Sequence, residues 1–200
     1  YFSDDGYVSA AYFYKDLRTW QEQVVTPRDF TGVQAPGFAG TVNSTQGFLT
    51  AWTDTTTGSI DGFEVTGVLP GRLISPVLDG FGISVSGSFL DSSLDSASDN
   101  SPIVVPGLSE QIVNATVFYE KSGFQARVSV RDRDDFLGER FGTSFTRNFT
   151  TVIGATLWDA QVSYDFGEAG IESLDGLAIT LQAYNLTEEP FTSLQGDNAL

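Results

Sequence analysis

Residues 156–166 read TLWDAQVSYDF and alternate apolar with polar side chains along almost the whole stretch. Successive residues of a β-strand point to opposite faces of a sheet, so the stretch predicts a strand with one apolar face and one face that carries Asp159 and Asp165. Strands of soluble proteins usually run about five or six residues, about half of this length. A tilted strand that crosses a bilayer needs about 9 to 11 residues.

Other segments of the chain repeat this alternation with a common phase. Lys15, Arg127 and Arg131 all fall opposite the apolar set of their segments. An arginine or lysine facing lipid at mid-membrane costs roughly 2 to 4 kcal/mol, so this phase has a physical cause. The pattern predicts an all-β fold, an antiparallel up-and-down transmembrane β-barrel of which about seven strands are present. The six further segments are residues 6–17, 59–69, 80–90, 111–121, 124–131 and 177–187.

The predicted strands are joined by connections of two kinds. Short connections with turn residues occupy 70–79, 122–123 and 167–176, whereas long polar stretches occupy 18–58, 91–110 and 134–155. Outer-membrane barrels have short periplasmic turns and long extracellular loops. A structureless loop of about forty residues is uncommon in a compact soluble domain. The three long stretches are therefore predicted to be extracellular loops.

Composition excludes several classes of function. The formal net charge of −16 would repel a phosphate backbone, so no nucleic-acid partner is expected. The chain has no Cys and no His, which removes thiolate metal sites, Ser-His-Asp triads and the commonest general base. No apolar run approaches the roughly 18 residues of a transmembrane helix. We therefore expect neither an enzyme nor a cofactor.

Two groups of closely spaced aspartates are candidate calcium ligands. Neither group follows the twelve-residue EF-hand loop with its central glycine and terminal glutamate. We expect solvated loops there and no metal. The groups are Asp91, Asp95 and Asp99, and Asp132, Asp134 and Asp135.

Several motifs resemble one known family. The hairpin YEKSGFQARVS at 119–129, followed by FLG at 136–138, resembles a hairpin late in the barrel of TonB-dependent outer-membrane receptors. NLTEEPF at 185–191 is similar to the segment that closes the penultimate strand of these barrels, and GFE at 62–64 and VPGLS at 105–109 match in order. The resemblance covers essentially the whole chain.

The resemblance implies a fold and a function. It is closest to a proteobacterial subgroup with many carbohydrate-scavenging members, whose barrels have about 22 strands. Residues 1–200 would be a C-terminal-side part of such a barrel, with the plug domain and the final strand absent. The family more often has an aromatic residue where Asp132 stands, which places the membrane boundary at or before Asp132.

The implied function is active transport. An outer-membrane receptor of a Gram-negative bacterium would bind a scarce extracellular ligand, such as an oligosaccharide or siderophore, for energy-coupled uptake into the periplasm. Its implied partners are that small-molecule ligand, outer-membrane lipid and lipopolysaccharide, and an energy-transducing inner-membrane complex engaged through the N-terminal part.

Candidate residues fall into three groups. Trp20, Phe48 and Trp52 in the predicted loops can stack on sugar rings or flat chelates, or alternatively anchor loops to one another or to lipid headgroups. Arg127, Arg131 and Asp159 are predicted to face the lumen, where the arginines would contact the plug or pair with Asp159, Asp165 or Glu120. Aromatic residues near strand ends are expected at the membrane interface: Tyr12, Tyr14, Tyr119, Tyr164 and Phe166.

Two other classes compete with this interpretation. A soluble all-β carbohydrate-binding or adhesin-like sandwich shares the alternation, but it predicts shorter strands and more even connections. A passive porin or autotransporter barrel would lack a plug domain. With free sheet edges and exposed apolar faces, the membrane interpretation predicts that these residues aggregate in water without detergent.

Overall fold

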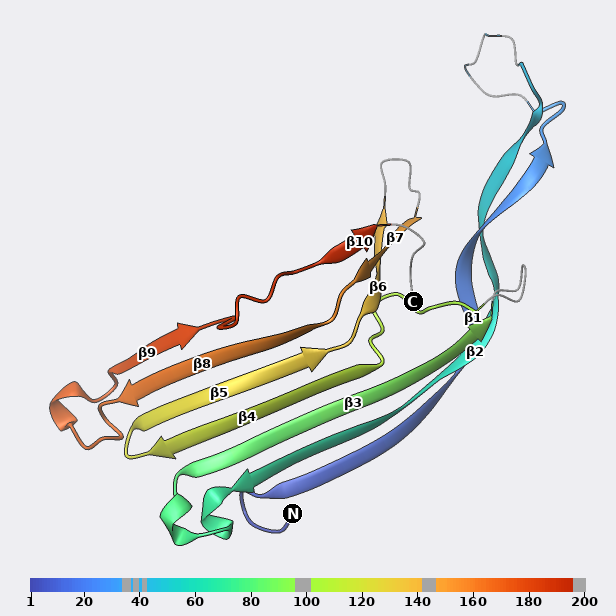
Figure 1. Cartoon of the computed structure of the whole chain (residues 1–200). Helices are drawn as coiled ribbons and strands as arrows, with labels where there is room; N and C mark the ends of the chain where they lie inside the picture. Colours follow the sequence, from blue (N-terminus) through green and yellow to red (C-terminus); the bar gives the residue numbers. More distant parts are fainter. Residues whose placement is uncertain (34–36, 38–39, 41–42, 96–101, 142–146, 196–200) are drawn as a thin grey trace. The chain divides into compact units, whose positions relative to one another are not determined.

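The structure is a computed structural model that describes residues 1–33, 37, 40, 43–95, 102–141 and 147–195 (Figure 1). In these ranges it is all-β and antiparallel, with three short 3₁₀ turns, η1 (Gly71–Leu73), η2 (Pro76–Leu78) and η3 (Glu172–Leu174). No helix in the described ranges is long and apolar enough to cross a membrane. The strands are β1 (Tyr7–Asp29), β2 (Gln46–Pro70), β3 (Phe81–Asp95), β4 (Gln111–Lys121), β5 (Phe124–Arg133), β6 (Phe136–Phe141), β7 (Arg147–Val152), β8 (Ala155–Asp165), β9 (Ala178–Ala183) and β10 (Ser193–Gln195).

The strands form two sheets. The larger is seven-stranded in the order β1-β2-β3-β4-β5-β8-β9, and the smaller pairs β10, β7 and β6. Neighbours in the larger sheet follow chain order except where the β6–β7 hairpin intervenes, so the predicted up-and-down topology is confirmed. The order begins at β1 and ends at β9, and the sheet is open, as a part of a barrel must be.

By contacts, the chain divides into two compact units. One contains residues 1–14, 61–91 and 104–200, and therefore holds β4 to β10 and parts of β1 to β3. The other contains residues 15–60 and 92–103, with the remaining parts of β1, β2 and β3. In the second unit Leu94 is buried against Gly58. A side chain at position 58 would overlap the backbone of Ser93.

The register shows that the predicted phasing is right. Cross-strand partners share a face of the sheet, so one apolar row can be followed from β3 to β9 and a polar row lies beside it on the other face. The apolar row is Ile83, Val117, Val128, Ala160 and Ala183. The polar row is Ser84, Thr116, Ser129 and Asp159.

The turn between β4 and β5 fixes this register. Ser122 and Gly123 have φ angles of 51° and 77°, the left-handed values of a two-residue type I′ hairpin turn. A side chain at Gly123 would overlap the carbonyl of Asp165. Lys121 therefore faces Phe124, and every later rung of the β4–β5 ladder follows from that pair.

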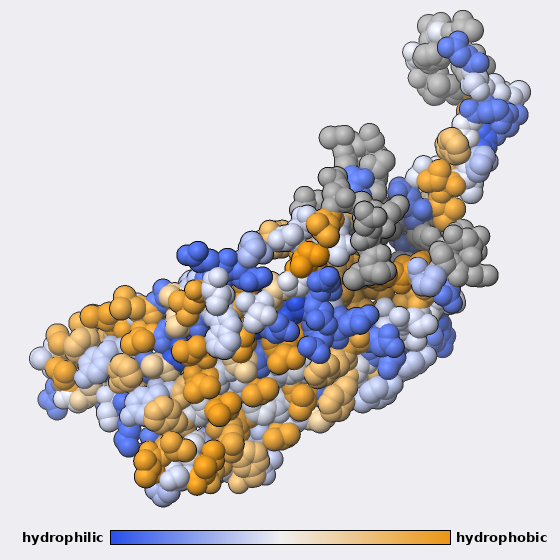
Figure 2. Space-filling model, in the orientation of Figure 1, coloured by the Kyte–Doolittle hydropathy of each residue, from blue (hydrophilic) through white to orange (hydrophobic). Residues whose placement is uncertain are grey.

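The apolar face of the sheet is not covered by protein. In the described ranges the buried hydrophobic side chains are Leu94, Val105 and Val152, whereas Val117 is 53% exposed and Leu181 72% exposed. Figure 2 shows apolar side chains on the exposed surface of the sheet strands. A sandwich buries the apolar faces of two sheets against each other, so the uncovered face argues against the soluble alternative.

Several predictions about segment ends were wrong, and one of them is the predicted loop 91–110, because β3 continues to Asp95. Residues 18–58 are not a loop, because β1 runs to Asp29 and β2 starts at Gln46. Residues 134–155 contain the β6–β7 hairpin. The strand expected over 177–187 stops at Ala183, because Asn185 has a φ of 51°, which takes the backbone out of the ladder.

Candidate functional site

A chain of polar side chains crosses β5, β8 and the end of β9 on the polar face. The Arg127 guanidinium donates a hydrogen bond to Gln161 Oε1, which also accepts from Gln182 Nε2 at 2.9 Å. The Tyr184 hydroxyl donates to Gln182 Oε1 at 2.6 Å. These groups line a pocket of about 120 Å³ together with Ser129, Asp159 and Ala160.

The carboxylate of Asp159 is held in this pocket by backbone. Asp159 Oδ1 accepts the Asn185 N–H at 2.8 Å. The Asn185 side chain in turn brackets Glu189, because its Oδ1 accepts the Glu189 N–H at 2.8 Å and its Nδ2 donates to the Glu189 carbonyl at 3.0 Å. The connection after β9 therefore orients Asp159, and the NLTEEPF motif supplies the residues that do so.

Arg127 does not have the expected carboxylate partner. Within the described part of the chain, the ion pairs are Arg18–Asp16, Arg72–Asp5 and Lys121–Asp79. The reason is the register: Arg127 faces Gln161 across β8, and Arg131 faces Asn114 and Leu157. Glu120 and Asp165 lie nearer the short turns.

A second polar cluster joins the β3–β4 connection to β5 and β6. Arg133 Nε donates to Ser109 Oγ at 2.6 Å, and its NH2 group donates to the Gly107 carbonyl at 3.1 Å. The guanidinium lies 3.8 Å from the ring centroid of Phe136. Ser109 is only 2% exposed. This cluster could not be predicted from the sequence alone, although it joins residues of the VPGLS (105–109) and FLG (136–138) motifs.

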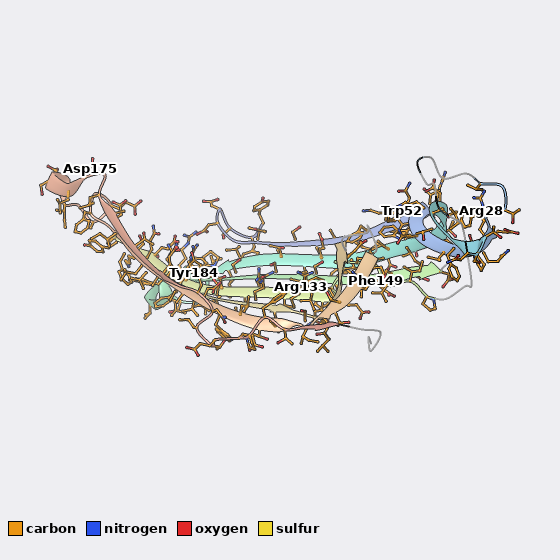
Figure 3. The ribbon with its side chains drawn as sticks, turned by 90° about the horizontal axis from the view of Figure 1, so that it is seen from above. Arg28, Trp52, Arg133, Phe149, Asp175 and Tyr184 are labelled. Atoms are coloured by element: carbon orange, nitrogen blue, oxygen red, sulfur yellow. The ribbon has the colours of Figure 1, made fainter. Side chains whose placement is uncertain are left out.

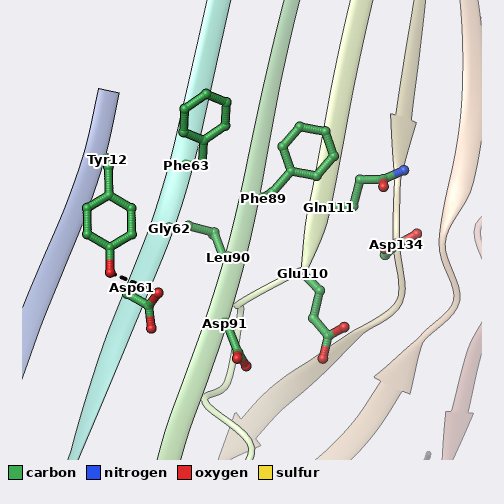
Figure 4. A pocket seen from close by; sticks show the side chains of 10 residues that line it. All are labelled: Tyr12, Asp61, Gly62, Phe63, Phe89, Leu90, Asp91, Glu110, Gln111 and Asp134. Carbon is green, nitrogen blue, oxygen red and sulfur yellow. Dashed lines mark hydrogen bonds between the residues drawn. The ribbon is translucent and has the colours of Figure 1, made fainter. Parts of the chain in front are cut away.

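A shallow pocket of about 390 Å³ is lined by Tyr12, Asp61, Phe63, Phe89 and further residues of β3, β4 and the connections beside them (Figure 4). The Tyr12 hydroxyl donates to Asp61 Oδ2 at 3.2 Å. Asp61 and Phe63 are two residues apart on β2 and thus share its apolar face.

Asp61 and Asp91 therefore place carboxylates on the apolar face, both beside the pocket that contains Tyr12. The outward side chains of β3 from Phe81 to Phe89 span about 27 Å along the strand, or about 20 Å of depth at a tilt near 40°. Asp91 follows on the same face. The apolar band is thus close to the roughly 25 Å of outer-membrane barrels.

Two of the aspartates named as candidate metal ligands hydrogen-bond within the protein. Asp132 accepts a hydrogen bond from the Thr156 hydroxyl, and Asp135 accepts the Gly154 N–H. Asp99 lies outside the described residues. Among the side chains that the structure describes, no three carboxylates are placed to hold a metal ion.

Comparison with known families gives one match. The family model described as TonB dependent receptor-like, beta-barrel, matches residues 1–186. The chain belongs to the TonB-dependent receptor family. No curated protein and no solved structure matched.

The match confirms the resemblance and explains the fold. The chain is a C-terminal part of a TonB-dependent receptor barrel, and its open, antiparallel sheet is a segment of that barrel wall. Members of the family are outer-membrane receptors and transporters of Gram-negative bacteria rather than enzymes.

The predicted ligand-contacting aromatics of this receptor lie on strands rather than loops. Trp20 is on β1, and Phe48 and Trp52 are on β2, all in the second compact unit. Phe48 is 72% exposed, Trp52 is half exposed, and Trp20 is half-buried. Figure 3 shows Trp52 and Arg28 on this same two-stranded part of the receptor.

The predicted interface aromatics divide between the two ends of the strands. Tyr119 packs on Phe81 with ring centroids 4.6 Å apart, near the short turns. Tyr164 and Phe166 meet edge to face at 5.1 Å, also near the short turns. Tyr12 lies instead in the pocket with Asp61, and Tyr14 is exposed two residues further along β1.

Proposed function

We propose that this chain forms part of the wall of an energy-coupled uptake receptor in the outer membrane of a Gram-negative bacterium. The receptor binds a scarce extracellular ligand, of the oligosaccharide or siderophore kind, and an inner-membrane complex supplies the energy for transport. The observation that carries the proposal is the uncovered apolar face, whose side chains stay in register from β3 to β9. Lipid is the partner that such a face requires.

The two faces then have separate roles. The polar face, with Arg127, Arg131 and Asp159, borders the lumen. On the outward face, the aromatic girdles contact the lipid headgroup region and lipopolysaccharide: Tyr12, Tyr14, Tyr119, Tyr164 and Phe166.

The first ligand contacts belong to the part of the receptor outside the membrane. Trp20, Phe48 and Trp52 offer flat apolar surfaces there, on strands that continue past the apolar band. Aromatic rings of this kind bind sugar rings or flat chelates by stacking. Trp52→Ala is expected to weaken ligand binding more than a substitution at Val25, which is exposed on the same unit.

The test uses the receptor expressed from its whole reading frame. Growth of a deletion strain on micromolar oligosaccharides or ferric siderophores identifies the ligand, and uptake is then measured with and without a proton uncoupler. The proposal expects receptor in the outer-membrane fraction and uptake that the uncoupler abolishes. Uptake that persists with the uncoupler would indicate a passive pore, and a receptor found in the soluble fraction would refute the membrane assignment.

A further inference from the structure

The pocket between β5, β8 and β9 has an uneven supply of hydrogen-bonding groups. Gln161 Oε1 already accepts from both Arg127 and Gln182, and Gln182 Oε1 accepts from Tyr184. The hydroxyl of Ser129 is paired with Thr116 at 2.9 Å. Both lone pairs of Gln161 Oε1 are therefore used within the protein, and Gln182 Oε1 and the Ser129 hydroxyl each have one protein partner.

Donors remain on the same groups. An amide nitrogen has two N–H groups and a guanidinium has five. In the described part of the structure, the Gln161 amide nitrogen makes no hydrogen bond, the Gln182 amide nitrogen makes one, and Arg127 makes one. The chain of contacts thus fixes these side chains in place and leaves their spare N–H groups for a bound molecule.

One acceptor lies beside these donors. Asp159 uses Oδ1 for the Asn185 N–H, which leaves Oδ2 for a hydroxyl donor. The Asp159 carboxylate also offsets the positive charge of Arg127. An arginine with two amides alone would favour a bound anion, whereas this pocket does not. A molecule whose oxygens both accept and donate, without net charge, satisfies all of these groups.

The size of the pocket limits the molecule further. About 120 Å³ is well above the roughly 10 to 15 Å³ that one water needs and below the roughly 300 to 1,000 Å³ of a drug-sized site. An extended peptide would need a longer groove, whereas one ring with its hydroxyls fits this space. Tyr184, labelled in Figure 3, comes directly after β9, and its exposed ring offers an aromatic surface beside the pocket.

We propose that this pocket is a binding subsite for a single neutral sugar ring on the barrel wall. The inference rests on the proposed function, because it assumes that the polar face borders the lumen through which the ligand passes. It narrows the ligand class to neutral, hydroxyl-rich molecules. Arg127, Gln161 and Gln182 donate to ring or hydroxyl oxygens, and Asp159 accepts from a hydroxyl.

The test measures binding of methyl glucoside, methyl galactoside and glucuronate to the intact receptor in nanodiscs by saturation-transfer NMR. We expect the receptor to bind at least one neutral glycoside and to prefer it to glucuronate. Gln161→Ala should weaken that binding at least about tenfold, since it removes the group that holds its two neighbours. Ser163→Ala is the matched control, because Ser163 is on the same face of β8 but outside the pocket and pairs with Thr180.

A charge-changing variant separates this subsite from a merely sticky surface. Asp159→Asn keeps an oxygen for the Asn185 N–H but replaces the second acceptor with a donor. It should weaken neutral glycoside binding and strengthen glucuronate binding, so that the preference falls at least about tenfold. A structural role for Asp159 alone would lower both affinities together.

Three results would overturn the proposal. The first is that the intact receptor binds no glycoside, and the second is that Gln161→Ala leaves glycoside binding unchanged. The third is that a photo-crosslinker attached at Ser129→Cys captures another segment of the receptor, which would show that a peptide occupies the pocket. Uncoupler-sensitive uptake by the same receptor distinguishes the outcomes. If the receptor shows uncoupler-sensitive uptake while the subsite tests fail, the transport function stands and only the subsite is refuted.

Discussion

Replacing Val117 with arginine tests whether the apolar face of the sheet contacts lipid. Val117 lies near the middle of β4 and is 53% exposed. Its partners across the two neighbouring strands are Ile83 and Val128, so the new guanidinium would be surrounded by apolar side chains. Among the described residues of β3 to β9, the row at that level is Ile83, Val117, Val128, Ala160 and Ala183, none of which is acidic.

The expected cost follows from depth in the membrane. Arginine on the lipid face costs about 2 to 4 kcal/mol at the midplane and about 0 to 1 kcal/mol near the interface. Val117→Arg should therefore lower the free energy of unfolding by about 2 to 4 kcal/mol. Val113→Arg should cost about 0 to 1 kcal/mol, because Val113 faces Asp132 near the level where charge returns to this face.

Thr116→Arg is the matched control on the opposite face. Thr116 is adjacent in sequence and shares a hydroxyl contact with Ser129 at 2.9 Å. Loss of that contact costs about 0.5 to 1.5 kcal/mol, with no lipid term. The ranking of destabilisation should thus place Val117→Arg first.

The assay is equilibrium unfolding of the whole receptor in phospholipid vesicles with guanidinium chloride, followed by tryptophan fluorescence. Two kcal/mol corresponds to about a 30-fold change in the folding equilibrium, well within the range of this method. The reasoning is refuted if Thr116→Arg destabilises as much as Val117→Arg, or if Val113→Arg costs as much as Val117→Arg. Either result would mean that the apolar face does not contact lipid as described.

Three further predictions concern single contacts. Arg133→Ala removes two charge-assisted hydrogen bonds and leaves the buried Ser109 hydroxyl without its partner, so the β3–β4 connection should open more easily by about 2 to 4 kcal/mol, measured by hydrogen exchange with Arg133→Lys as the conservative comparison. The Lys121 ammonium, 2.9 Å away, holds the pKa of Asp79 below its ordinary value of 3.8. The stabilisation from this pair is therefore present above pH 3.8 and is lost as the pH falls through the lowered pKa, so proteolysis of the η1–η2 turn should become faster over that range. In Asp79→Asn the rate of this proteolysis should not change with pH over the same range. Gly82→Ala should lower the free energy of unfolding by about 1 to 3 kcal/mol, because the new methyl group would overlap the ring of Phe118 on the facing strand. An unchanged midpoint of thermal unfolding would contradict this contact.

The strands that the sequence predicts well are those with one face in lipid and one in a polar environment. Residues 111–121 agree with β4 at both ends, because the alternation lasts as long as the apolar band does. The long parts of β1 and β2 were missed because water on both faces removes the reason for alternation while backbone pairing continues. Their signal was β propensity, as in the threonine-rich stretch of β2 at residues 53–57.

Partners across the sheet were harder to predict than faces. The sequence placed Arg127 on the polar face, but its hydrogen bond to Gln161 depends on the register of β5 against β8. The intervening β6–β7 hairpin hides that register in the sequence. The two-residue turn at 122–123, by contrast, sets the β4–β5 register directly, so pairs there could be derived.

The unbroken register from β3 to β9 also limits how such a receptor can change over evolutionary time. One residue inserted in β5 would turn Arg127 and Arg131 toward lipid and valines toward the lumen, in a single step. An insertion in the connection between β3 and β4 would leave every rung in place. Length variation is therefore tolerated in the connections and selected against in the strands. New ligand preferences arise through changes in the connections or through single substitutions on the polar face.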